Sequence, residues 1–148
     1  MRSRRMLLSL LSSLALLAPL AVSGASPAQA DMSASEYLVY RINQARSNHG
    51  LAPLRVSSDL SSYARAHSAS MLRQRTLFHT SNFTVLCCWS SISENVGYDT
   101  SARGVHHALM NSAPHRANIL DPTKKAVGVG IARENGMLWV TQIFRRPR

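Results

Sequence analysis

The sequence predicts an α+β domain in which helices pack on an antiparallel sheet. Two observations indicate this class. Apolar residues recur at helical spacing in the first half of the chain, and in the last third they alternate with small residues as in a strand. Helices that come first and strands that come last are typical of α+β domains, where the two kinds of element are segregated.

The first thirty residues have the pattern of an export signal. Arginines at positions 2, 4 and 5 precede an apolar run over 6–22, and an Ala-Gln-Ala triplet at 28–30 supplies the small residues that a signal peptidase reads. Serines and Pro19 interrupt the run, which disfavours a membrane anchor. We therefore expect a signal peptide over 1–30, cleavage after Ala30, an extracellular product and no transmembrane segment after cleavage. The general secretory and twin-arginine routes both stay open.

The remaining residues, 31–148, are expected to form one monomeric domain. They contain 14 basic and 7 acidic residues, a formal net charge of +7 with neutral histidines. This excess favours anionic partners such as wall polymers or lipid head groups, although the arginines are scattered along the chain. Nucleic acid is disfavoured, because there is no recognised motif and no set of aromatic residues interleaved with the basic ones.

Two helices are predicted in the first half of the domain. The first begins at Ser33, where Ser-Ala-Ser-Glu is a capping-box pattern, and ends at Gly50. The second begins at Ser57 or Ser58 and carries His67 on its apolar face. A histidine in such a position is more often a satisfied core residue than a ligand.

Residues 80–99 are predicted to be a long irregular segment, because they are rich in serine and asparagine. The segment contains adjacent cysteines, Cys87 and Cys88. Neighbouring Cα atoms lie about 3.8 Å apart, below the usual disulfide span of about 4.4 Å or more. Buried free thiols beside Trp89 are therefore the favoured interpretation, with a vicinal disulfide and a soft-metal ligand pair as alternatives.

A short helix over 100–110 and a C-terminal hairpin complete the predicted elements. His106 and His107 point about 100° apart on that helix, so they cannot form an i, i+4 metal pair and are expected on the surface. Residues 126–132 and 137–144 read as strands joined by a Glu-Asn-Gly turn. Glycines in the first strand leave space for the close approach of another element.

Three polar residues, His79, Glu94 and His115, each lie in a short distinctive frame far from the others in sequence. Two imidazoles and a carboxylate can hold zinc with an open position, or form a hydrogen-bonded network that moves protons. Their spacing is not local, unlike that of H-E-x-x-H. On the residues alone, polar loop side chains that satisfy buried backbone groups are the preferred interpretation.

Eight motifs, in order over residues 36–144, make the chain resemble the bacterial branch of the CAP superfamily, also called the SCP, PR-1 or YkwD-like family. The resemblance implies an α-β-α sandwich with a central antiparallel sheet and a polar cleft. The motifs are Ile42-Asn43-x-x-Arg46, Gly50-Leu51-x-Pro53-Leu54, Ala64-x-x-His67-Ser68-x-x-Met71, Phe78-His79, Glu94-Asn95-Val96, Ser112-x-x-His115-Arg116-x-Asn118-Ile119-Leu120, Gly128-Val129-Gly130 and Trp139-Val140-x-Gln142-x-Phe144.

The resemblance implies that His79, Glu94 and His115 are the two cleft histidines and the glutamate that bind a divalent ion, often zinc, in many members. The chain departs from the family pattern, because Ser93 and Leu109 replace a glycine and a tryptophan and Ser112 stands where other members carry a second glutamate. His106 or His107 is a candidate for the missing ligand. The full set of candidate cleft residues is His79, Glu94, Asn95, Ser112, His115, Arg116 and Asn118.

The missing glutamate favours a secreted ligand-binding or cell-envelope module without turnover, with a lipid or an anionic envelope polymer as its ligand. No serine or cysteine frame supplies a nucleophile beside a base. The alternative is a metal-dependent hydrolase, a peptidase or nuclease, in which His79, Glu94 and His115 hold Zn²⁺ or another divalent cation and a bound water attacks. The sequence does not identify a substrate.

Overall fold

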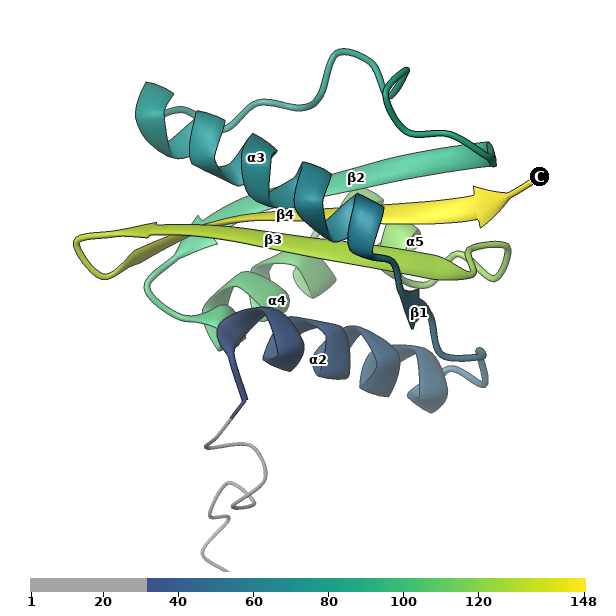
Figure 1. Ribbon diagram of the computed structural model, residues 1–148. Helices are drawn as coiled ribbons and strands as arrows, with labels where there is room; N and C mark the ends of the chain where they lie inside the picture. Colours follow the sequence, from purple (N-terminus) through teal and green to yellow (C-terminus); the bar gives the residue numbers. More distant parts are fainter. Residues whose placement is uncertain (1–31) are drawn as a thin grey trace, which may run out of the picture.

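Helices cover both faces of a four-stranded sheet, as Figure 1 shows, with α3 on one face and α2, α4 and α5 on the other. The computed structural model describes residues 32–148, so the predicted signal peptide lies outside the described residues. The elements are α2 (Ala34–Asn48), β1 (Arg55–Val56), α3 (Ser58–Gln74), β2 (Trp89–Asp99), α4 (Ala102–Asn111), α5 (Ala113–Ile119), β3 (Ala126–Glu134) and β4 (Met137–Pro147).

The sheet has the strand order β1-β3-β4-β2, so β2 lies at one edge. The three long strands are antiparallel neighbours, and the two-residue β1 pairs in parallel with the start of β3. The β3–β4 hairpin turns at Asn135 and Gly136, with φ values of +49° and +77°. A two-residue turn in which both residues have positive φ matches the twist of the flanking strands. The α+β class and the hairpin are therefore confirmed.

The prediction of an irregular segment over 80–99 is wrong for its second half, which forms β2. Serine, asparagine and glycine have low strand propensity, but pairing with β4 from Ser91 to Asp99 supplies the backbone hydrogen bonds. Helix α5 is also missed, since Ser-Ala-Pro at its start reads as a turn. Pro114 lies in the first turn of α5, where its missing N–H costs no helical bond.

The glycines of β3 allow α3 to pack directly on the sheet. A Cβ atom at Gly128 would overlap the backbone at Leu60, and one at Gly130 would overlap the backbone at Ala64. This confirms the close approach expected from the sequence. It also fixes α3, and with it His67, against the face of the sheet that Glu94 shares.

A buried arginine joins the helices of the other face. Arg46 on α2 is 1% exposed and donates hydrogen bonds of 2.9 Å to the carbonyl oxygens of Ala52, Ile119 and Asp121. These three bonds use the Nε and Nη1 donors of the guanidinium group and so compensate much of the cost of burying it. The bonds to Ile119 and Asp121 hold the end of α5 against α2.

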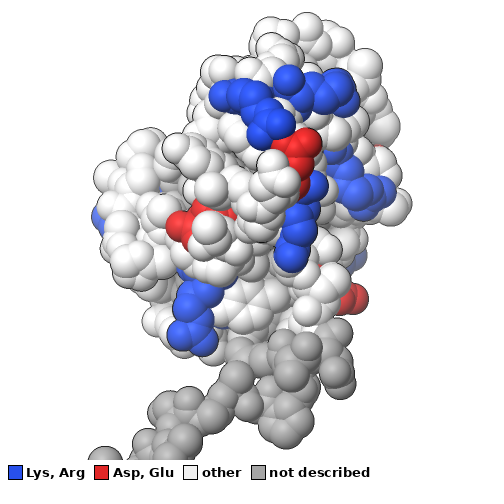
Figure 2. All heavy atoms as spheres, turned by 90° about the vertical axis from the view of Figure 1, so that its left-hand side faces the viewer, with Lys and Arg blue, Asp and Glu red and all other residues white. Residues whose placement is uncertain are grey.

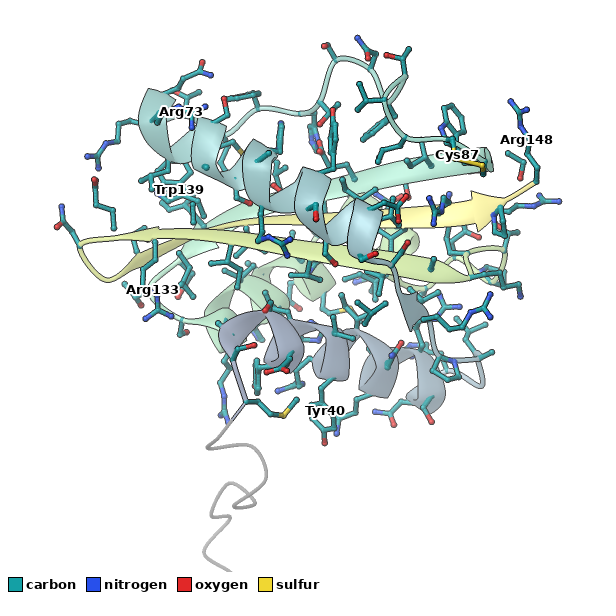
Figure 3. All side chains as sticks on the ribbon, in the orientation of Figure 1. Tyr40, Arg73, Cys87, Arg133, Trp139 and Arg148 are labelled. Carbon is teal, nitrogen blue, oxygen red and sulfur yellow. A yellow bond between two sulfur atoms is a disulfide. The ribbon has the colours of Figure 1, made fainter. Side chains whose placement is uncertain are left out.

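The expectation of buried free thiols is wrong. Cys87 and Cys88 are joined by a disulfide, and both residues are exposed. Cys88 has a φ of +63°, a left-handed conformation that turns adjacent side chains toward each other although their Cα atoms are only 3.8 Å apart. Figure 3 shows Cys87 and Arg148 at the same end of the sheet, and the Arg148 backbone N–H donates to the Cys88 carbonyl oxygen at 3.3 Å.

Basic side chains are dispersed over the surface. Figure 2 shows one face of the protein, on which lysines and arginines lie in several separate groups with acidic side chains near some of them. Within residues 32–148, no helix has the length and apolar composition that a bilayer span needs.

Candidate functional site

The carboxylate of Glu94 on β2 is the centre of a hydrogen-bonded cluster. Its Oε1 accepts from His79 Nδ1 and from the Thr80 backbone N–H, both at 2.9 Å, and its Oε2 accepts from Thr80 Oγ1 at 2.7 Å. The Glu94 side chain is 3% exposed. The segment that follows α3 therefore folds back over the edge strand and covers this carboxylate.

The contact with Glu94 sets the orientation of the His79 ring. An ionised carboxylate only accepts hydrogen bonds, so Nδ1 of His79 carries the proton and Nε2 has a free lone pair when the ring is neutral. Among the described residues, Nε2 of His79 has no hydrogen-bond partner, and the side chain is 58% exposed. The pair thus presents one oriented ring nitrogen to a ligand.

His67 on α3 lies behind this pair. Its Nδ1 is 3.6 Å from Glu94 Oε2 and 3.2 Å from Thr141 Oγ1. Burial lowers the pKa of His67, the Glu94 carboxylate partly opposes that effect, and a charge on His79 lowers the pKa further. His67 is therefore neutral at pH 7. It lies between the cluster and the α3 face of the core, and its buried Nε2 has no hydrogen-bond partner among the described residues.

Asn95 and Asn118 position the second predicted histidine. Successive strand residues point to opposite faces, so Asn95 faces α5 while Glu94 faces α3. Asn95 Nδ2 donates to the His115 carbonyl oxygen at 3.1 Å, and Asn118 Nδ2 donates to Asn95 Oδ1 at 2.9 Å and to the Glu94 carbonyl oxygen at 3.3 Å. These bonds fix α5, and therefore His115, along the outer edge of β2.

His115 contacts Ser112 and not the carboxylate. Its Nδ1 is 2.8 Å from Ser112 Oγ, and the two residues line a cavity of about 240 Å³ at the edge of β2. Burial and, second, the charge of His79 lower the pKa of His115, so its ring is neutral at pH 7. Among residues 32–148, Glu94 is hydrogen-bonded to His79 and Thr80 but not to His115.

Three further candidates lie away from the cluster. Arg116 donates to the Met110 carbonyl oxygen at 3.1 Å, near the end of α4. His106, expected on the surface, is 5% exposed and lines a groove between α2 and α4 together with the exposed His107. Helix α4 turns these two rings away from the cavity that Ser112 and His115 line, so neither replaces the missing glutamate.

Thr80 is the functional-site residue that sequence reasoning missed. It donates two hydrogen bonds to Glu94, one from its backbone and one from its hydroxyl. A hydroxyl directly after His79 was the available signal. The sequence could not identify Glu94 as its partner, because the two residues are fourteen positions apart and no local structure fixes their distance.

The arrangement fits Glu94 as the hydrogen-bond partner of His79 rather than as a metal ligand. Both carboxylate oxygens already accept hydrogen bonds and the group is covered. Within the described part of the chain, no three His, Cys, Asp or Glu side chains are grouped so as to hold a metal ion. The Nε2 atoms of His79, His115 and the mostly buried His67 have no hydrogen-bond partner among the described residues, but these rings are not grouped as a metal site would be.

Cavities larger than the one beside His115 lie elsewhere. One of about 570 Å³ lies next to Cys87, Cys88 and Trp89. An apolar cavity of about 500 Å³ lies between α2, α3 and β3, lined by residues such as Val39, Tyr40 and Val129. It contains none of the predicted site residues. Titratable groups with lowered pKa values and specific partners are a further indicator of a functional site, and two of them, His67 and His115, lie at the edge of β2.

Comparison with known proteins identifies the fold. A model of the cysteine-rich secretory protein family, CAP, matches residues 39–144. The chain is 34% identical over 129 residues to YkwD of Bacillus subtilis (strain 168), which covers 79% of this chain and 49% of YkwD. The chain therefore spans about half the length of that relative.

Solved structures show the same architecture. An extracellular protein containing an SCP domain from Bacillus anthracis matches with a TM-score of 0.68 at 22% identity, covering 76% of this chain and 40% of that one. An outer surface protein from Borrelia burgdorferi matches with a TM-score of 0.71 at 16% identity, covering 78% of this chain and 93% of that one. At these identities the likeness shows the fold alone. Together with the family match over most of the domain, these findings show that the chain belongs to the CAP, or cysteine-rich secretory protein, family.

Proposed function

We propose that this protein is a secreted, non-catalytic binding module of the cell envelope, and that its ligand binds at the edge of β2 between His79 and His115. The signal pattern of residues 1–30 supports export. The similar structures from Bacillus anthracis and Borrelia burgdorferi are described as extracellular and outer-surface proteins, which supports the same location.

The observation that carries the non-catalytic proposal is the state of Glu94. A general base or a metal ligand needs a carboxylate oxygen that can reach the substrate or the ion. Both oxygens of Glu94 are hydrogen-bonded to His79 and Thr80, and only 3% of the side chain is exposed. The carboxylate therefore orients His79 and does not reach a ligand.

The cavity beside His115 favours a ligand with an apolar part. Its walls are mainly apolar and come from the segment before His79, from β2 and from α4, including Leu77, Tyr98 and Leu109. Ser112 and His115 form its polar side. Since the His115 ring is neutral at pH 7, it recognises a hydrogen-bonding group rather than a charge. A lipid therefore fits better than an anionic polymer.

The test uses dihexanoylphosphatidylcholine, a short-chain zwitterionic lipid, titrated below its micelle concentration into ¹⁵N-labelled protein. We expect saturable shifts at residues around Ser112 and His115. Leu77→Ser should weaken binding by about fivefold or more, because it removes apolar contact area of the cavity wall. The matched control is Val85→Ser, which changes an exposed residue outside the cavity and should leave the affinity within about twofold. Equal changes in lipid affinity for the two variants would contradict the lipid proposal.

A zinc titration separates this proposal from the hydrolase alternative. We expect no stoichiometric binding of zinc by calorimetry at pH 7.5. One zinc ion per chain, bound at pH 7.5 but not below about pH 6.5, where histidine protonates, and lost in His115→Ala, would contradict the proposal and favour a metal centre.

A further inference from the structure

Helices α2 and α4 border a groove of about 430 Å³, which we call the α2–α4 groove. The two helices pack on each other through apolar residues such as Ile42 and Val105, and mainly polar residues line the groove beside that contact. The residues recur three or four apart along each helix, as expected for one face. They are Arg41, Gln44 and Asn48 on α2, and Arg103, His106, His107 and Met110 on α4.

The groove has positive charge and no carboxylate. Its lining includes Arg41, Arg103 and three histidines, His49, His106 and His107, but no aspartate or glutamate. The ion pairs within residues 32–148 involve neither of these arginines. Arg41 is partly buried and donates to the Tyr37 hydroxyl at 2.8 Å, whereas Arg103 is exposed, so neither guanidinium group is paired with a carboxylate in the described part of the chain.

Two buried nitrogen atoms in the groove also lack hydrogen-bond partners. These are Nδ1 of His106, whose residue is 5% exposed, and Nε of Arg41. Burial, and then the charges of Arg41 and His107, lower the pKa of His106 to about 4. His106 is therefore neutral at pH 7, and the fixed positive charges of the groove are those of Arg41 and Arg103. An anion in the groove would supply the counter-charge that these two guanidinium groups lack among the described residues.

We propose that the α2–α4 groove is a binding site for a phosphate-type oxyanion, held mainly by Arg41 and Arg103. Guanidinium groups match the oxygens of phosphate or sulfate in paired hydrogen bonds, and donors from two helices suit an anion with several acceptor oxygens. The site is separate from the Glu94 cluster and the cavity beside His115, which together we call the β2-edge cleft. Helix α4 carries Leu109 toward that cavity, and Arg103 and His106 toward the groove. Free phosphate and the phosphodiester of a lipid head group share this chemistry.

The first experiment titrates the ¹⁵N-labelled protein with inorganic phosphate at pH 7 and constant ionic strength, compared with chloride. We expect saturable shifts along the facing sides of α2 and α4. Arg103→Gln should weaken the affinity by about tenfold or more, as expected for a lost charge-assisted hydrogen bond. The control is Arg73→Gln, which makes the same charge change on α3. Figure 3 shows Arg73 on the other side of the sheet from Tyr40 of α2. The control should stay within about twofold.

A second readout does not depend on affinity alone. Sulfate, which remains a dianion in mildly acidic solution, should raise the pKa of His106 in the wild-type protein and in Arg73→Gln, and much less in Arg103→Gln. If both substitutions weaken phosphate binding equally, the anion is attracted only by the net charge of the protein, and the proposed site is wrong. Shifts that do not saturate, or a His106 pKa that sulfate leaves unchanged, would overturn it as well.

Vesicles then distinguish the two sources of the anion. Binding to phosphatidylglycerol vesicles, lost in Arg103→Gln and absent with phosphatidylcholine, together with weak binding of free phosphate, would assign the lipid head group. Binding of inorganic phosphate without binding to either vesicle would assign the free anion. Either result supports the oxyanion site, whereas binding to neither probe refutes it.

Discussion

The β2-edge cleft and the α2–α4 groove both contain buried or half-buried histidines, yet only one of them contains a carboxylate. In the cleft, Glu94 fixes His79 through Nδ1 and lies 3.6 Å from His67. In the groove, His106 faces Arg41 and has an unpartnered Nδ1. In the cleft the acidic residue accepts hydrogen bonds and orients His79, whereas the lining of the groove has no acidic residue to pair with its two arginines.

The largest expected effect comes from removing that acidic residue. Glu94→Gln should lower the free energy of unfolding by about 3 kcal/mol, because it breaks a buried charge-assisted network and places an amide NH₂ against donors from His79 and Thr80. Urea unfolding at pH 7 measures this. In the control, Glu134→Gln removes a partly exposed carboxylate that pairs with Arg75, and it should cost less than about 1 kcal/mol. Similar costs for both variants would mean that the cleft does not depend on its carboxylate.

The next effect concerns the groove at acid pH. The pKa of His106 is lowered from 6.5 to about 4 in the folded protein, so between these pH values the unfolded chain binds more protons than the native state. Stability therefore falls as the pH drops from 6.5 to 4, by about 2 kcal/mol from this residue. His106→Gln should remove most of this loss in urea unfolding at stepped pH, while His107→Gln should keep it. An unchanged pH dependence in His106→Gln would contradict the burial of a neutral ring.

The smallest expected effect concerns the disulfide in the segment between α3 and β2, which also contains His79. A disulfide between Cys87 and Cys88 closes almost no loop of chain, so it restrains the unfolded state very little. Replacing both cysteines with serine should change the free energy of unfolding by less than about 1 kcal/mol. Loss of the folded state would contradict this prediction. It would show that the cleft depends on the disulfide, a second difference between the cleft and the groove.

Elements specified by local chemistry were predictable from the sequence. The capping box at Ser33, the end of α2 near Gly50 and the Asn135-Gly136 turn each depend on neighbouring residues only. The close approach at Gly128 and Gly130 was also predictable, because a residue without a side chain leaves space for another element whatever its position in the sequence.

Features that depend on distant partners were not predictable. Strand β2 has weak strand propensity and forms because β4 pairs with it. The vicinal disulfide depends on one left-handed residue, Cys88. In the site, the resemblance to the family singled out His79, Glu94 and His115 together. Only the folded chain shows that the second oxygen of Glu94 accepts a hydrogen bond from Thr80, and that His115 contacts Ser112.

The most direct test of the central claim, that Glu94 orients His79 and is not available to a metal or substrate, is the tautomer of the His79 ring. Long-range ¹H–¹⁵N NMR spectra above the pH at which the ring titrates report which nitrogen carries the proton. We expect the proton on Nδ1 in the wild-type protein, because Nδ1 donates to Glu94 at 2.9 Å. We expect this preference to be lost in Glu94→Gln. A proton on Nε2 in the wild-type protein, or identical spectra for both proteins, would contradict the account.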